Sequence, residues 1–551
     1  MNGSVARGQV GWISQTRLRR RMLLQAAGAT AGLALAGGLR PGGAARAAAP
    51  SSPTTLIMAP NFVIRSLDPG HTLEPDGEMV THACYDALVT FDGADLSTPK
   101  PHLATSWKLS GAGRLYTFTL RPNVRFASGN PLTSADVKWS FDRVINLQSN
   151  PAFFLANVEE VQAPDPQTVV LRLRAPQPSI LPILSNGALG IMDSKLVTAQ
   201  GGDAGPDAKT KDQAEAWLQS HSAGSGAFMI ESYTPTQELV LVRNPNHWRA
   251  PAKMDRIVLR NVPEASTQAL QLERGDLDVA MSLGQENLQT LRRLSSVTIQ
   301  ASMVATSFVM MVNMDPSLSG QLSNPKVLQA IRYALDYDGI LAIAGPGAQR
   351  MAGVIPNDLP GALDPREAFK TDRNKAKALL AGLGDVKGRL MFASDATSYG
   401  IQYSLLAQKI QADLATAGIA VELNGLPGTV ELGQYRGGKA PALFGGYAAD
   451  YPDATDFLVY LPGQLVGKRM NWPASASPAA QDLAQWGDQA AQEADPRARV
   501  ALLQKIQRRL LEIGPYAPLF TPALPFGYRS DLRGVTYNSV WEVDFYTIRR
   551  A

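Results

Sequence analysis

Residues 445–457, GGYAADYPDATDF, carry three aspartates beside two tyrosines and contain no basic residue. The acids are Asp450, Asp453 and Asp456, and strand-forming residues precede them at 440–444. Aspartates in such a stretch often form turns, because their side chains hydrogen-bond to the local backbone. The alternative is a carboxylate that is held where a positively charged group binds. The segment by itself leaves both interpretations open.

Motifs of the common enzyme classes are missing from the sequence. There is no G-x-G-x-x-G, Walker loop, H-E-x-x-H or G-x-S-x-G, and in GPGAQR Arg350 stands where a dinucleotide motif needs its third glycine. Cys84 is the only cysteine, which excludes an intramolecular disulfide and a thiolate metal site. The five histidines are scattered without ligand spacing: His71, His82, His102, His221 and His247. We therefore predict that the protein is not an enzyme and has no catalytic residue, metal or cofactor.

The first 47 residues have the composition of an export signal. RLRRRMLLQ precedes the run AAGATAGLALAGGL, and ARA at 45–47 offers a cleavage site. The run is too short and too rich in glycine for a membrane span. The Arg20-Arg21 pair fits a twin-arginine signal, although Arg19 stands at the usual Ser/Thr position. The alternative, an amphipathic presequence, is less well supported because the run has no polar face.

Removal of this segment would change the charge of the protein. Residues 1–47 hold seven arginines, no lysine and no acid, so the formal charge would fall from +4 to −3. The basic isoelectric point thus belongs to the signal and does not indicate a nucleic-acid partner. No cysteine lies at the cleavage point to carry a lipid. We expect a periplasmic protein that is exported, soluble and not lipidated.

Strand and helix patterns alternate along the rest of the chain. Apolar and polar residues alternate at 115–121, 169–174 and 238–243, which predicts half-buried strands. Helical spacing recurs in four stretches, of which two begin with recognisable caps, a Thr133–Asp136 capping box and Asn324 before Pro325. A Gly- and Asp-rich stretch at 198–212 is expected to be an exposed insertion. The pattern indicates a large α/β protein.

Six stretches, taken in order, resemble the family 5 extracellular solute-binding proteins, which serve peptide-type ABC importers. They are YDALVTFDG, PHLATSWKLS, YTFTLRPNVRFASGNPLTSADVKWSFDRV, GSGAFMIESYTPTQELVLVRNPNHW, NPKVLQAIRYALDYDGI and ADYPDATDF. Each motif alone is weak, but the ordered set extends over nearly the whole chain after the signal.

The resemblance implies an α/β fold of the two-lobed periplasmic binding protein type (type II, cluster C-like) with an extra inserted subdomain. Mapping the motifs onto the chain gives the boundaries: lobe 1 from 52–85, 185–302 and 523–551, the inserted subdomain from 86–184, and lobe 2 from 303–522. Two chain crossings, near residues 303 and 522, would form a hinge. Such lobes close on a ligand through contacts that exist only in the closed state.

The resemblance also implies a ligand site. Peptide-binding members place at the position of Asp450 the aspartate that pairs with the α-ammonium of the peptide, and Tyr447 matches an aromatic position. A buried ammonium without a counter-charge is costly, and a ring beside it adds cation–π attraction. Ala448 would let the ligand approach the backbone, and Met310 would contact side chains, with core packing as its alternative. Asp453 and Asp456 are expected to be turn and helix-cap groups.

A cation for a peptide carboxylate is not selected by any motif. Arg332, Arg350 and Arg436 are candidates by region, although solvated surface charge is the favoured interpretation of each. We therefore predict the periplasmic substrate-binding component of an ABC importer that captures peptides or similar amine-bearing solutes. Its partners would be the ligand and an inner-membrane permease with its ATPase, and we expect a monomer. The alternatives are a binder of a nickel complex, opine or sugar, or a sensor or chaperone that uses the same cleft.

Overall fold

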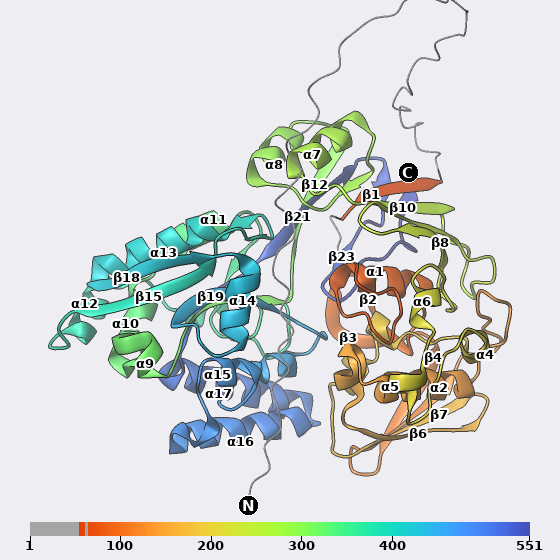
Figure 1. Ribbon diagram of the computed structural model, residues 1–551, viewed down its shortest axis with the longest axis horizontal. Coiled ribbons are helices and arrows are strands. Elements are labelled where there is room, and N and C mark those ends of the chain that lie inside the picture. Colours follow the sequence, from red (N-terminus) through yellow and green to blue (C-terminus); the bar gives the residue numbers. More distant parts are fainter. Residues whose placement is uncertain (1–53, 61–63) are drawn as a thin grey trace, which may run out of the picture. The chain divides into compact units, whose positions relative to one another are not determined.

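The computed structural model describes residues 54–60 and 64–551, which belong to a compact unit from Pro50 to Ala551. The predicted export signal at 1–47 lies outside the described residues, so its cleavage and its twin-arginine character stay predictions. Three larger β-sheets organise the described part of the chain (Figure 1).

The first sheet has seven strands in the order β12-β21-β11-β1-β10-β9-β8. The central strand β1 runs parallel to both neighbours, β10 and β11, and all other pairs are antiparallel. The sheet therefore joins the beginning, the middle and the end of the chain. Its strands are β1 (Thr55–Ala59), β8 (Phe228–Thr234), β9 (Glu238–Arg243), β10 (Arg256–Arg260), β11 (Val279–Ala280), β12 (Val297–Met303) and β21 (Ala523–Arg529).

The second sheet has six strands in the order β14-β20-β13-β19-β15-β18. They are β13 (Thr306–Val312), β14 (Gln349–Arg350), β15 (Val386–Ala393), β18 (Ile419–Leu426), β19 (Ala442–Ala448) and β20 (Tyr516–Thr521). Every residue of β13 is buried, and its side chains alternate between two cores. Met310 packs on one face and Met311 on the other.

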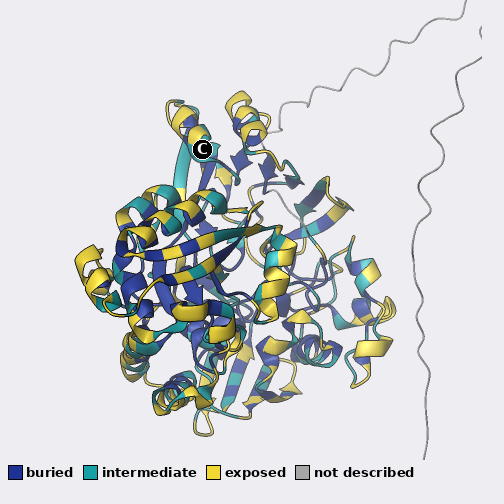
Figure 2. Cartoon of the chain, turned by 60° about the vertical axis from the view of Figure 1, so that its left-hand side comes forward, coloured by how far each residue is buried: buried dark blue, intermediate teal, exposed yellow. Residues whose placement is uncertain are grey.

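Helices cover both faces of this second sheet (Figure 1). Four pack on the face of Met310: α10 (Pro325–Ala334), α11 (Tyr337–Ala344), α12 (Arg373–Leu380) and α13 (Tyr403–Ala417). Two pack on the face of Met311: α16 (Pro478–Gln492) and α17 (Pro496–Ile513). Figure 2 shows such helices with one buried and one exposed side, the pattern expected of amphipathic helices. Asn324 caps α10 by accepting a hydrogen bond from Lys326 N, as predicted.

The third sheet is a four-stranded antiparallel sheet in the order β4-β5-β7-β6. Its strands are β4 (Ala104–Ser110), β5 (Leu115–Leu120), β6 (Val158–Asp165) and β7 (Thr168–Leu173), and helix α2 (Ser134–Leu147) shares their core. The predicted capping box is confirmed: Thr133 N donates to Asp136 Oδ2 at 2.9 Å at the start of α2.

The chain passes between the first two sheets at two places. It leaves β12 and enters β13 between residues 303 and 306, and it leaves β20 and enters β21 between 521 and 523. Because β12 pairs with β21 and β13 pairs with β20, the two crossings run beside one another. Among the residues that the structure describes, no helix combines the length and hydropathy that crossing a bilayer requires.

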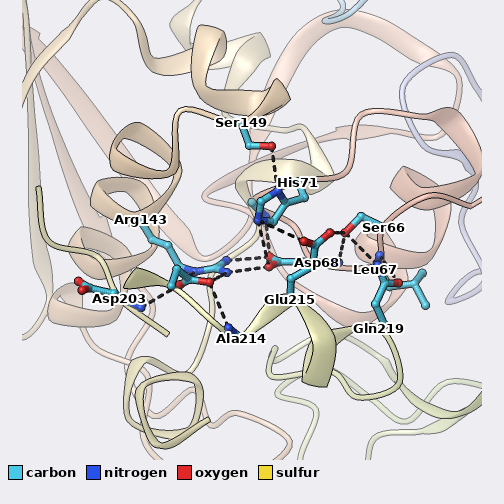
Figure 3. A network of polar contacts seen from close by, with 12 residues as sticks. Ser66, Leu67, Asp68, His71, Arg143, Ser149, Asp203, Ala214, Glu215 and Gln219 are labelled. Atoms are coloured by element: carbon cyan, nitrogen blue, oxygen red, sulfur yellow. Dashed lines mark hydrogen bonds and ion pairs between the residues drawn. The ribbon is translucent and has the colours of Figure 1, made fainter. Parts of the chain in front are cut away.

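A buried ion-pair network ties α2 to two distant loops (Figure 3). The Arg143 guanidinium donates to both carboxylate oxygens of Asp68, at 2.7 and 2.6 Å, and to both of Asp212, at 2.9 and 2.8 Å. Asp212 ends the Gly- and Asp-rich stretch 198–212, which is expected from its composition to be an exposed insertion. That expectation is wrong for Asp212, whose side chain is 2 % exposed because it completes this ion pair.

Candidate functional site

The acidic segment begins where β19 passes close to β13. At Gly446 a side chain is excluded, since a Cβ there would lie 2.8 Å from Cε2 of Phe308 on β13. Ala449 N then donates to Ala305 O at 2.8 Å, which keeps the chain against the start of β13. The next residues turn away from the sheet and enter the 3₁₀-helix η5 (Ala454–Tyr460).

Two carboxylates meet at the hydroxyl of Tyr447. This hydroxyl lies 3.1 Å from Asp450 Oδ2 and 3.4 Å from Asp456 Oδ1, and Asp450 N donates to Asp456 Oδ2 at 2.7 Å. A hydroxyl has one proton to donate, so the two acids share it. Within residues 54–60 and 64–551, neither acid forms an ion pair with a lysine, arginine or histidine. The arrangement is a pair of half-buried to buried carboxylates without a counter-charge.

The electrostatics of this pair favour a bound cation. Burial, and next the neighbouring Asp450 carboxylate, hold the pKa of Asp456 well above its ordinary value. Burial also raises the pKa of Asp450, against the opposing hydrogen bond from Tyr447. Two like charges in a partly desolvated place retain a proton unless a positive group arrives. A ligand ammonium would supply the charge that the protein does not.

Asp453, the middle acid, is a structural group as predicted. It accepts a hydrogen bond from Thr455 N at 2.8 Å at the start of η5. Its carboxylate is paired with Arg499 of α17 through two hydrogen bonds. This ion pair neutralises the charge of Asp453. Of the three aspartates in the segment, only Asp450 and Asp456 are therefore without a basic partner among the described residues.

A cavity of about 670 Å³ opens beside the pair. Tyr447, Asp450 and Asp456 line it, together with Phe153 and Gln177 from segments next to the four-stranded sheet. The volume is in the range of about 300–1,000 Å³ that small-molecule sites occupy. No lysine, arginine or histidine is among its described lining residues. The cavity is therefore acidic and partly aromatic, which suits a small cationic group.

A third carboxylate lies nearby and was not found from the sequence. Glu78, in helix α1 (Pro75–Cys84), is 6 % exposed and accepts a hydrogen bond from Asn186 Nδ2 at 3.1 Å. The same nitrogen lies 3.3 Å from the backbone oxygen of Asp450. Burial raises the pKa of Glu78 well above its ordinary value, Asn186 opposes this, and Asp450 adds to it. Only the fold brings these distant segments together, so no local motif could have indicated them.

The predicted site residues divide into two groups. The structure brings Tyr447 and Asp450 together at the cavity. Ala448 is exposed on β19, pairs with Thr306 and does not line the cavity. Met310 is 1 % exposed in the core, which favours the core-packing alternative for it. Contact of Ala448 or Met310 with a ligand stays a prediction.

The three candidate arginines do not line this cavity. Arg332 is 1 % exposed and donates to the backbone oxygens of Tyr516 and Gly514, so the expectation of a solvated surface charge is wrong for it. It is also wrong for Arg350, which is half-buried, lies over the ring of Tyr337 and donates to a backbone oxygen. Both arginines are therefore held by backbone oxygens inside the fold. Arg436 is exposed.

The described residues contain no cluster of three or more His, Cys, Asp or Glu side chains that could hold a metal ion. The acidic and aromatic residues that line the Asp450 cavity suit binding of an organic cation.

Known proteins similar to this chain agree with the predicted fold. The model of the bacterial extracellular solute-binding proteins, family 5 Middle, matches residues 98–465. The probable D,D-dipeptide-binding periplasmic protein DdpA of Escherichia coli K12 is 26 % identical over 491 residues, which are 87 % of this chain and 91 % of that protein. The di/tripeptide-binding protein 2 of Pseudomonas aeruginosa is 24 % identical, and the alignment covers 92 % of this chain and 97 % of that protein.

Solved structures with the same fold carry different ligands. The periplasmic binding protein DppA of Helicobacter pylori, in complex with a peptide, is 24 % identical with a TM-score of 0.71. The superposition covers 90 % of this chain and 98 % of the DppA chain. NikA of Brucella suis, in complex with Fe(III)-EDTA, is 21 % identical with a TM-score of 0.76. The superposition covers 90 % of this chain and 100 % of the NikA chain. The predicted two-lobed α/β binding-protein fold is confirmed.

Proposed function

We propose that this chain, which belongs to the bacterial extracellular solute-binding proteins of family 5, is the substrate-binding component of an ABC importer. It captures peptides or similar amine-bearing small solutes and delivers them to an inner-membrane permease with its ATPase. The observation that carries this proposal is the Asp450–Asp456 pair, which lines a cavity of about 670 Å³ and has no basic neighbour. The peptide-binding names of the curated relatives support the same class of ligand.

The positively charged end of the ligand binds at Asp450. Transfer of an ammonium group from water into a cavity costs free energy, and a carboxylate already in place offsets that cost. The ring of Tyr447 adds cation–π attraction, and its hydroxyl holds the Asp450 carboxylate in position. Since burial raises the pKa of both acids, and the Asp450 carboxylate raises that of Asp456 further, ligand binding is coupled to loss of a proton from the pair.

Capture involves closure of two lobes about the paired crossings near residues 303 and 522. Lobe 1 comprises 52–85, 185–302 and 523–551, lobe 2 comprises 303–522, and 86–184 forms the inserted subdomain. The antiparallel pairs β12–β21 and β13–β20 join at these crossings and support this role. Two connections that lie side by side restrict the relative motion of the lobes to bending about one axis.

The protein acts in the periplasm as a monomeric binding protein and not as an enzyme. The basic, Ala/Gly-rich first 47 residues support export by the twin-arginine route. The family membership and the binding-protein names of the relatives support a role without catalysis. A metal chelate with net negative charge would meet an acidic cavity here, which makes that alternative ligand class electrostatically unfavourable.

Calorimetry with one peptide in three forms tests the proposal. A di- or tripeptide with a free amino end binds, and the same peptide with an acetylated amino end binds at least about a hundredfold more weakly, as expected when a buried charge pair is lost. The same peptide with an amidated carboxyl end keeps its affinity, because no basic side chain lines the cavity. Equal affinity of the free and acetylated forms would overturn the assignment. Native mass spectrometry of the protein as purified identifies the cargo that it carries.

A further inference from the structure

The cavity beside the Asp450–Asp456 pair has an apolar part as well as an acidic one. Apolar atoms make up the larger part of its lining surface. The apolar residues that line it come from three parts of the chain. They are Phe153, Ala156, Ala175 and Pro176 next to the four-stranded sheet, Tyr451, Leu458, Val459, Leu461 and Leu465 in and around η5, and Ala491 in α16.

Two of these residues are large apolar side chains that the protein leaves in contact with water. Phe153 is 44 % exposed, and Leu465, the first residue of helix α15 (Leu465–Arg469), is 45 % exposed. In the described part of the chain seven large apolar side chains are exposed, and two of the seven line this one cavity. Single exposed apolar residues are common on proteins, but their gathering at a cavity indicates a surface that a ligand covers.

A row of aromatic rings holds Phe153 in place. Its ring centroid lies 4.3 Å from that of Phe154, which is 1 % exposed, and Phe154 lies 6.5 Å from the ring of Tyr451. Tyr451 follows Asp450 in the sequence and lines the same cavity. The exposed face of Phe153 is therefore fixed before a ligand binds, which lowers the entropy lost on binding.

The acidic and apolar parts of the cavity adjoin on the 3₁₀-helix η5. Side chains three residues apart in a 3₁₀-helix lie above one another, separated by about 6 Å along the axis. Asp456 and Val459 have this spacing, and both line the cavity. Successive residues of an extended peptide are about 3.3–3.6 Å apart. An apolar side chain on the first or second residue of a ligand would therefore reach Val459 when the ligand ammonium lies at the acid pair.

The polar side chains around this apolar surface already have partners. Asn157 Nδ2 donates to Gln177 Oε1 and to Ala175 O, both at 2.9 Å, and Asn157 Oδ1 accepts from Ala175 N at 3.1 Å. Gln464 and Gln492 are exposed, so water satisfies them. A polar ligand side chain would gain little here, whereas an apolar one would remove apolar surface from water.

We propose that this cavity selects amine-bearing ligands that carry a large apolar side chain, aromatic or branched aliphatic, on the first or second residue from the amino end. This inference rests on the proposed function and specifies its ligand. The ammonium group binds at the Asp450–Asp456 pair, and the apolar side chain covers Phe153, Val459 and Leu465. Burial of apolar surface on the ligand and on the protein stabilises the complex.

Calorimetry on the full-length protein with four dipeptides tests the proposal. Leucyl-alanine and asparaginyl-alanine differ at the first position, and alanyl-leucine and alanyl-asparagine differ at the second. Leucine and asparagine side chains are similar in shape but opposite in polarity. We expect at least one leucine peptide to bind about tenfold or more tightly than the asparagine peptide of the same order. Equal affinities within both pairs would overturn the proposal.

Two variants and a matched control locate the binding of the apolar side chain. Phe153→Ala and Leu465→Ala should each reduce the ratio of leucine-peptide to asparagine-peptide affinity at least about threefold. Equal losses for both peptides would mean that these residues only pack between segments of the protein, and would contradict the proposal. Leu405→Ala is the control, because Leu405 is 48 % exposed but does not line the cavity, and it should leave the ratio unchanged.

Acetylated forms of the same peptides distinguish this inference from the proposed function. A preference for leucine that persists without any loss of affinity on acetylation would keep the apolar site and overturn the binding of the amine. A large loss on acetylation without a preference for leucine would do the reverse. Asp450→Asn should weaken the leucine and asparagine peptides by the same factor. If none of the peptides binds, both proposals fail.

Discussion

The Asp450–Asp456 pair should show compensation when one acid is removed. In the parent protein the two carboxylates lie against one hydroxyl, and each raises the free energy of ionising the other. Asp450→Asn removes one charge, but it also lets Asp456 ionise fully a short distance away. The remaining carboxylate then recovers part of the attraction for the ligand ammonium.

The geometry sets the expected magnitudes. Two unit charges about 4 Å apart attract by about 4 kcal/mol at the effective dielectric constant of about 20 that suits partly buried sites. Because Asp450 is half-buried and Asp456 compensates, we expect Asp450→Asn to cost about 2–3 kcal/mol of binding free energy. The double variant with Asp456→Asn has no nearby charge left and should cost about 4–5 kcal/mol, which is more than the sum of the losses in the two single variants.

Isothermal titration calorimetry with a free-amine dipeptide measures these losses. Asp488→Asn is the matched control, because Asp488 lines the same cavity but is exposed on α16, and it should cost less than about 1 kcal/mol. An unchanged affinity in Asp450→Asn, or an equal loss in Asp488→Asn, would contradict the binding of the ligand ammonium by Asp450. Independent, additive effects of Asp450→Asn and Asp456→Asn would refute the compensation.

Three further predictions concern stability, measured by urea unfolding. Arg143→Met should destabilise the protein by about 3–5 kcal/mol, because it leaves Asp68 and Asp212 buried without a counter-charge. An unchanged free energy of unfolding would contradict a stabilising role of this ion-pair network. Thr133→Ala should cost about 1 kcal/mol through the lost cap of α2, and more than twice this would indicate a further role. Burial, and next Asp76, raise the pKa of Glu542 from 4.5 to about 8, so its protonated form favours the folded state. The contribution of Glu542 to the free energy of unfolding is complete below about pH 4.5 and is lost as the pH rises to about 8. Glu542→Gln should abolish that decline. Parallel pH profiles of the stability of the parent protein and the variant would contradict the prediction.

The local signals in the sequence predicted local structure well. The Thr133–Asp136 capping box and the Asn324 cap depend on residues within one turn of each other, and both form as predicted. The alternation of apolar and polar residues is also a local pattern, and the two stretches predicted from it form strands β5 and β7. The expectation of a solvated Arg332 is wrong because nothing near this residue in the sequence shows that its guanidinium group donates to the backbone oxygens of residues 514 and 516.

Long-range contacts explain what the sequence could not indicate about the sites. Tyr447 and Asp450 could be predicted together because three positions separate them. Asn186, which contacts Asp450 O, comes from a segment more than two hundred residues away. The same holds for Phe153 and Leu465, which come from distant segments of the sequence but line one cavity in the fold.

A crystal structure of the protein with a bound free-amine peptide would show directly whether Asp450 binds the ligand ammonium. We expect the ligand nitrogen to lie within hydrogen-bonding distance of the Asp450 carboxylate, about 2.7–2.9 Å, beside the ring of Tyr447. A ligand whose amino end lies elsewhere, with the Asp450 carboxylate facing water, would contradict it.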